Sequence, residues 1–261
     1  MRIVLHAGFH KTGTTSVQRF LRGNRAVLRR HVRVFTREGQ EPLCEAARAF
    51  SVTRDALDRA LLAAEWGRFV AALDVSDPRP VLMSSEDLSG HMPGRHGVMR
   101  YDAAALILGD LAATLPKGAA LTVALSLRET GAWRRSCWAQ HVRATRHLGG
   151  LAEYLSGPRT DLAVDAQAVQ EALDARGRVV TQVVTWALED QRGPFGPAAP
   201  LLEMLDLPAR VLARLTPPVH VNASLPDAVM AELLALNRSD LDPVTWARAK
   251  RAVIDAAQRA H

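Results

Sequence analysis

The sequence predicts an α/β fold in which a mostly parallel sheet of about five strands is flanked by helices in three layers. Two observations carry this prediction. Short apolar segments that resemble strands alternate with longer segments of helical periodicity, the pattern of a parallel sheet with helical crossovers. The first strand-like segment, Arg2–Ala7, runs into a glycine-bounded turn and then into a helix that starts on hydroxyl residues. We expect one domain over residues 1–261, with C-terminal helices of about 225–261 packed on it.

The individual elements follow from local patterns. Five segments have the composition of strands, and the most apolar of them, 119–127, is expected to be central: 2–7, 32–36, 81–83, 119–127 and 178–186. Helical segments separate the strands or follow them: 14–23, 25–30, 43–50, 53–73, 102–115, 131–146, 163–175, 198–205, 226–238 and one starting at Asp242-Pro243. In the segment 53–73, one apolar face is expected to belong to the core: Leu57, Leu61, Leu62, Trp66, Phe69, Val70 and Leu73.

Composition limits the class of protein. The chain is 48% hydrophobic and 23% charged, as is typical of a globular domain with a large core. No apolar run reaches the length of a membrane span, and the N-terminus lacks the long apolar segment of a signal peptide. The two cysteines, Cys44 and Cys137, are too few for a disulfide framework. These features predict a cytoplasmic protein without a membrane span.

The net positive charge of the chain favours an anionic ligand or partner. The net charge is +6 and the isoelectric point is about 10.1. The arginines are dispersed, and aromatic residues make up only 5% of the chain without alternating with basic ones, so we expect no nucleic-acid partner. A pocket for a polyanionic cofactor accounts for the same charge. No His, Cys or carboxylate spacing resembles a metal site, and none is expected.

The turn after the first strand has the features of a phosphate cradle. Gly8 and Gly13 are five residues apart, as are the framing glycines of a nucleotide-triphosphate P-loop. That motif continues with Gly-Lys-Ser/Thr, whereas here Thr14 and Thr15 follow Gly13 and the lysine lies earlier, at Lys11. Backbone N–H groups and the helix dipole would meet an anion at this turn, and Lys11 adds a full charge. The turn is thus P-loop-like but of another kind.

The segment His10-Lys11-Thr12-Gly13-Thr14-Thr15-Ser16 resembles the 5′-phosphosulfate loop of sulfotransferases that use 3′-phosphoadenosine 5′-phosphosulfate (PAPS). The bacterial branch of that family often has this Lys-Thr-Gly-Thr-Thr form. The resemblance implies that PAPS is the co-substrate and that the loop holds its 5′-phosphate. It also implies that Lys11 is catalytic and meets the oxygen that bridges phosphorus and sulfur. The cofactor-binding residues would be His10, Lys11, Thr12, Gly13, Thr14, Thr15 and Ser16.

A second pair of residues extends the resemblance. Arg128 follows the 119–127 segment, and Ser136 lies eight residues further on, in the next helix. This arrangement resembles the 3′-phosphate site of the same sulfotransferases. A guanidinium grips a phosphate with two hydrogen bonds, and the hydroxyl adds a neutral one. Residues 219–224 are a weak match to the family's loop that closes over the nucleotide.

Sulfuryl transfer to a hydroxyl needs a general base. Glu86 and Asp87 follow the strand 81–83, where the carboxyl ends of parallel strands place ligand-binding residues. Glu86 resembles the glutamate base of carbohydrate and tyrosyl-protein sulfotransferases and is our choice, with His10 and Asp87 as rivals. The structural alternative for Glu86 is an N-cap or first-turn acid that faces a helix dipole.

Taken together, these resemblances imply a sulfotransferase that moves the sulfuryl group of PAPS to a hydroxyl or amine. The acceptor is a small molecule, a carbohydrate or a lipid, and the sequence leaves its identity and the oligomeric state open. One alternative is a P-loop-type small-molecule kinase or NTPase, which the missing Gly-Lys-Thr disfavours. Another is a non-catalytic nucleotide-binding protein, against which Lys11 and Glu86 both argue.

Overall fold

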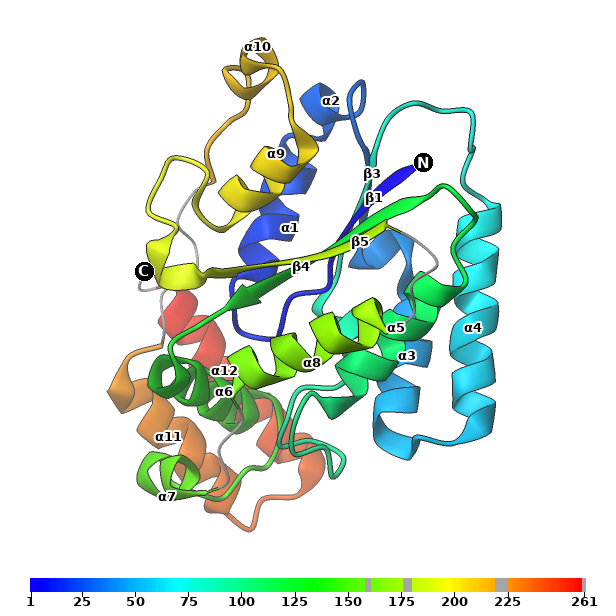
Figure 1. The fold of residues 1–261 in the computed structure, drawn as a ribbon. Helices are drawn as coiled ribbons and strands as arrows, with labels where there is room; N and C mark the ends of the chain where they lie inside the picture. The colour runs from blue at the N-terminus through cyan, green and yellow to red at the C-terminus, as the bar shows by residue number, and fades with distance from the viewer. Residues whose placement is uncertain (158–160, 176–179, 219–224, 260–261) are drawn as a thin grey trace. The chain divides into compact units, whose positions relative to one another are not determined.

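Five parallel strands form one sheet, as the computed structural model of the chain shows (Figure 1). The structure describes residues 1–157, 161–175, 180–218 and 225–259. The spatial order of the strands is β2-β3-β1-β4-β5. The predicted α/β fold with a five-stranded sheet is confirmed, and the sheet is parallel throughout. The strands are β1 (Arg2–His6), β2 (Arg33–Thr36), β3 (Val81–Ser84), β4 (Ala120–Leu127) and β5 (Val180–Ala187).

The chain divides into two compact units, each of which is described here by itself. The first unit comprises Met1–Glu129 and Thr160–Val219 and holds the whole sheet. The second comprises Thr130–Arg159 and His220–His261. The expectation of a single domain stays a prediction. The helices of the first unit are α1 (Thr14–Gly23), α2 (Arg25–Leu28), α3 (Glu41–Thr53), α4 (Ala56–Ala71), α5 (Asp102–Ala113), α8 (Leu162–Asp174), α9 (Ala199–Leu205) and α10 (Ala209–Leu212).

Helices cover both faces of the sheet in the first unit (Figure 1). On one face, Val4, Leu82 and Ala124 of three neighbouring strands share a buried cluster with α1 and α9. On the other face lie α3, α5 and α8, with α8 in contact with β4 and β5. Successive strand residues point to opposite faces, so strands buried on both sides are apolar at almost every position. Ile3, Val4 and Leu5 are accordingly all buried.

Two expectations about individual elements need correction. Leu57 and Leu61 of α4 are 78% and 45% exposed, although Leu62 and Trp66 of the same helix are buried. The helix α4 packs mainly on α3 and meets the sheet through the contact of Phe69 with Phe35 of β2, so it buries a narrower stripe. β4 is an interior strand, but β1 is the middle one. A short helix, α7 (Leu151–Ser156), lies in a stretch to which the sequence analysis assigned no element.

The second unit is helical. It contains α6 (Thr130–Ala144), α7, α11 (Asp227–Arg238) and α12 (Pro243–Arg259). Trp138 and Val142 of α6 pack against Met230 and Leu233 of α11. The ammonium of Lys250 donates to the Thr145 carbonyl at 2.9 Å and to Asn237 Oδ1 at 2.8 Å, which ties α12 to the end of α6. Among the residues described in both units, no helix is long and apolar enough to cross a membrane.

Candidate functional site

The turn between β1 and α1 has an unusual backbone. Gly8, Lys11 and Gly13 have φ angles of +28°, +68° and +98°. Glycine adopts positive φ readily, whereas lysine is uncommon there, so the turn holds Lys11 in a left-handed conformation. No side chain caps the start of α1 at Gly13. The first N–H groups of a helix have no carbonyl partner within it, and they coincide with the positive end of the dipole. The turn therefore has the properties of an anion site.

Contacts with the end of β4 hold the turn in place. The buried hydroxyl of Thr12 donates to the Phe9 carbonyl at 2.6 Å and lies 2.6 Å from Ser126 Oγ. Arg128 Nη1 donates to the Lys11 carbonyl at 3.1 Å. β1 and β4 are neighbours at the point where the strand order reverses, and such switch points bind ligands at the carboxyl ends of the strands. The structure thus brings Arg128 to the loop, and its predicted role at the 3′-phosphate stays a prediction.

Buried polar atoms without partners gather beneath the loop. Among the described residues, Thr14 Oγ1, His6 Nε2 and Trp186 Nε1 are buried and lack a hydrogen-bond partner. A Cβ atom at Gly8 would lie 2.9 Å from Thr14 Oγ1 and 3.0 Å from His6 Nε2. Burial lowers the pKa of His6 to about 3, so its ring is neutral at pH 7. An unpaired buried hydroxyl is costly, so Thr14 fits a site that a polar ligand completes.

This crowding makes Gly8 sensitive to substitution. We expect Gly8→Ala to lower the free energy of unfolding by about 1–3 kcal/mol, because the new Cβ meets two side chains and the backbone is left-handed. Thermal denaturation measures the change. Gly23→Ala is the matched control, since nothing lies within 4 Å of a Cβ there. Equal unfolding temperatures for the two variants would contradict this view of the turn.

Glu86 follows β3 and contacts α1, the helix that starts at the turn. Its Oε2 accepts a hydrogen bond from Gln18 Nε2 at 3.1 Å, and the same amide is 3.2 Å from the Ser84 carbonyl. Glu86 is half-buried and begins a short 3-10 helix, Glu86–Ser89. The N-cap of that helix is Ser85, so Glu86 is not an N-cap, but it is a first-turn acid, as the structural alternative also allowed. The carboxylate of Glu86 is therefore positioned by Gln18, a side chain of α1, the helix that follows the turn.

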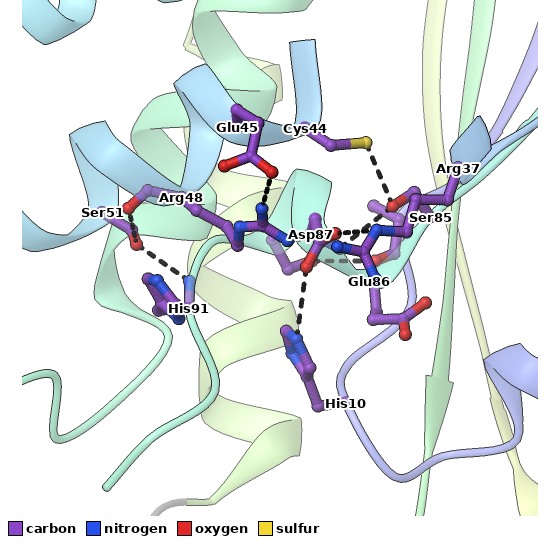
Figure 2. Close-up of polar contacts among 12 residues, drawn as sticks. His10, Arg37, Cys44, Glu45, Arg48, Ser51, Ser85, Glu86, Asp87 and His91 are labelled. Carbon is purple, nitrogen blue, oxygen red and sulfur yellow. Dashed lines mark hydrogen bonds and ion pairs between the residues drawn. The ribbon is translucent and has the colours of Figure 1, made fainter. Parts of the chain in front are cut away.

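Asp87 is the centre of a cluster of cationic and polar side chains (Figure 2). One of its oxygens accepts from Arg48 Nη1 and from Arg37 Nε, both at 2.9 Å. The other is 3.5 Å from His10 Nε2. Burial acts to raise the pKa of Asp87, but the hydrogen bond from His10 and the charges of His10, Arg48 and Arg37 outweigh it and lower the pKa. Asp87 is therefore an ionised anchor for the two arginines.

Tyr101 and Asp87 both contact His10. Its backbone N–H donates to Tyr101 Oη at 3.0 Å, and its Nδ1 is 3.1 Å from the same oxygen. The other ring nitrogen, Nε2, faces Asp87 Oδ1 at 3.5 Å, so one edge of the ring meets Tyr101 and the other meets Asp87. Asp87 and Tyr101 therefore fix the ring that precedes Lys11.

The cluster predicts a pH-dependent stability. The pKa of Asp87 is lowered on folding, so its stabilising effect is present above the unfolded pKa of about 3.9 and is lost as the pH falls through the folded value. We expect Asp87→Asn to cost about 3 kcal/mol at pH 7, because Arg37 loses its ion pair and Arg48 keeps only its pair with Glu45. Chemical denaturation at pH 7 measures this cost. Asp190→Asn, at an exposed position, is the control, and equal losses in the two variants would contradict the anchor role.

The remaining predicted residues lie as follows. Lys11 and Ser16 are half-buried and Thr15 is exposed, all at the turn or in the first turn of α1. Ser136 is half-buried in α6, in the second unit, while Arg128 belongs to the first, so their joint role stays a prediction. Residues 219–224, the weak match to the family's nucleotide-closing loop, lie outside the described residues.

In the described part of the chain, no group of three or more His, Cys, Asp or Glu residues is placed to hold a metal ion.

Four residues of the site were missed by the sequence analysis: Gln18, Arg37, Arg48 and Tyr101. A local signal existed for Gln18, which lies four residues after Thr14 and hence on the same side of α1. No local signal in the sequence pointed to Arg37, Arg48 or Tyr101.

A scan of the chain against protein-family models gives no match, and neither does a comparison with curated proteins.

Proposed function

We propose that the chain is a sulfotransferase that moves the sulfuryl group of PAPS to an acceptor hydroxyl or amine. The observation that carries the proposal is the placement of Lys11. It lies in a left-handed turn between the uncapped start of α1 and Arg128, which holds its carbonyl. A phosphate loop that contains a lysine and is bordered by an arginine matches a donor with phosphate at both its 5′ and 3′ positions.

The residues of the loop fit the donor in charge and hydrogen bonding. The N–H groups at Gly13, Thr14 and Thr15 would hold the 5′-phosphate, and the unpartnered Thr14 hydroxyl would donate to it. Thr12 would contribute its backbone, because its hydroxyl already binds Phe9 and Ser126. Arg128 would take the 3′-phosphate.

PAPS supplies an activated sulfuryl group, whose transfer leaves negative charge on the 5′-phosphate. Lys11 would stabilise that charge with a fixed ammonium, a contribution that is largest when it acts only as the charge develops. Glu86, oriented by Gln18, would accept the proton of the acceptor. His10 and Asp87 would position the loop from the side.

The rival functions are a P-loop-type kinase or NTPase and a non-catalytic nucleotide-binding protein. A kinase of that kind uses an aspartate after a strand to reach its metal. Here Asp87 after β3 is tied to Arg37 and Arg48, which argues against that use. The half-buried Glu86 beside the loop argues for catalysis over binding alone.

Thermal denaturation with nucleotides separates these functions. We expect 3′,5′-adenosine bisphosphate, the product of the donor, to stabilise the protein by about 2.7 kcal/mol at a concentration of 100 times its dissociation constant. ATP with Mg²⁺ is expected to raise the unfolding temperature much less. Stabilisation by ATP with Mg²⁺ alone would contradict the proposed donor and would favour the kinase.

A further inference from the structure

Two adjoining cavities follow β2, the strand at the open edge of the sheet. Their volumes are about 420 and 230 Å³. Arg25, Val34 and Phe35 line both cavities, so the two form one continuous groove between β2 and the helices α1 and α2. We call it the β2 groove.

Arginines dominate the walls of the β2 groove. Five line it: Arg22, Arg25, Arg29, Arg33 and Arg79. Three of them already form ion pairs: Arg22 with Glu38 at 2.7 Å, and Arg33 and Arg79 with Asp77 at 3.6 and 2.6 Å.

Arg25 and Arg29 are different from the other three. Both are exposed, and their guanidinium groups make no ion pair with any residue in the described ranges. They are four residues apart, on one face of α2 and its C-cap, and about 6 Å apart along the axis. The groove therefore carries two unneutralised cations in a row.

The β2 groove begins next to the proposed base. Arg22 lines it, and Gln18, one turn earlier on the same face of α1, bonds to Glu86. Thr36 also lines it and is paired in register with Ser84, two residues before Glu86. An acceptor whose hydroxyl reaches Glu86 can thus extend toward Arg25 and Arg29 without leaving the first unit.

We propose that the β2 groove binds the acceptor and that this acceptor is an acidic saccharide chain, whose carboxylate or sulfate groups meet Arg25 and Arg29. The inference rests on the proposed function. A saccharide offers hydroxyl groups and anionic groups on the same chain, which matches a base and a cationic groove placed side by side. A nucleic acid fits less well, because Phe35 is the aromatic residue of the lining and its ring packs at 5.0 Å against Phe69.

The test uses a galacturonate hexamer and the uncharged maltohexaose of equal length as probes, titrated calorimetrically into the full chain. We expect the uronate to bind and maltohexaose not to bind, with affinity that falls as salt rises. The double variant Arg25→Gln/Arg29→Gln should weaken uronate binding about tenfold. The control Arg30→Gln/Arg210→Gln removes the same charge from exposed arginines that do not line the groove, and it should change the affinity less than about twofold.

Three results would overturn the inference: equal weakening in both double variants, equal binding of maltohexaose, or tighter binding of a thymidylate hexamer than of the uronate. Titration of 3′,5′-adenosine bisphosphate into the same variants separates this inference from the proposed function. If the bisphosphate binds and the uronate does not, the acceptor assignment is wrong and the donor assignment stands. If the uronate needs Arg25 and Arg29 but the bisphosphate does not bind, the groove is an anion site and the sulfotransferase proposal is wrong.

Discussion

Lys11→Ala is expected to lower kcat by about 10²–10³-fold, as the loss of one preorganised group at a developing negative charge does elsewhere. The ammonium would act on the oxygen that bridges phosphorus and sulfur, where charge grows as the bond breaks. Alanine and lysine both carry a Cβ, so the left-handed backbone at φ +68° is strained in the same way in both. We therefore expect the turn to persist and the binding of 3′,5′-adenosine bisphosphate to weaken far less than turnover.

Initial rates of 3′,5′-adenosine bisphosphate release from PAPS, with an acidic saccharide as acceptor, measure this effect. Lys117→Ala is the matched control, since Lys117 is exposed in the turn before β4. Lys11→Arg should restore part of the rate at most, because a planar guanidinium does not replace a compact ammonium. Turnover near the wild-type value in Lys11→Ala would show that the lysine has another role.

Glu86→Gln is expected to lower kcat by about 10²–10⁴-fold, the range that a positioned general base contributes. The variant is nearly isosteric, and the amide oxygen of a glutamine still accepts the hydrogen bond from Gln18. Stability and nucleotide affinity should therefore stay close to those of the wild type. The loss is expected in the proton transfer alone.

Two further variants sharpen this result. Glu203→Gln, at an exposed position of α9, removes one carboxylate without touching the site and should leave kcat unchanged. His10→Gln tests the rival base and should lower kcat less than Glu86→Gln, because His10 is held between Tyr101 and Asp87. If Glu86→Gln kept the wild-type rate while His10→Gln lost it, the histidine would be the base.

The fold was largely predictable because its elements are encoded locally. The five strands are short apolar segments that differ in pattern from the helices between them. The order of the strands was not predictable, since which strand becomes the middle one depends on how the crossovers pack. The exposed Leu57 shows the same limit, because an apolar stripe does not reveal how much of it a neighbouring helix covers.

The site was predictable only where one stretch of chain builds it. The turn from Gly8 to Ser16 and the pair Glu86-Asp87 are both continuous in sequence. The bonds that complete the site join distant residues, with separations of 68 positions for Gln18 and Glu86 and 91 for His10 and Tyr101. Such pairings depend on how the strands and helices are placed in space, which the sequence alone does not provide.

The central claim is that the loop after β1 holds the 5′-phosphate of the donor. A crystal structure of the complex with 3′,5′-adenosine bisphosphate tests it most directly. We predict the 5′-phosphate within hydrogen-bond distance of the N–H groups at Gly13, Thr14 and Thr15, and the 3′-phosphate next to Arg128. A bisphosphate bound away from this loop, or with its adenine end at Lys11, would contradict the account.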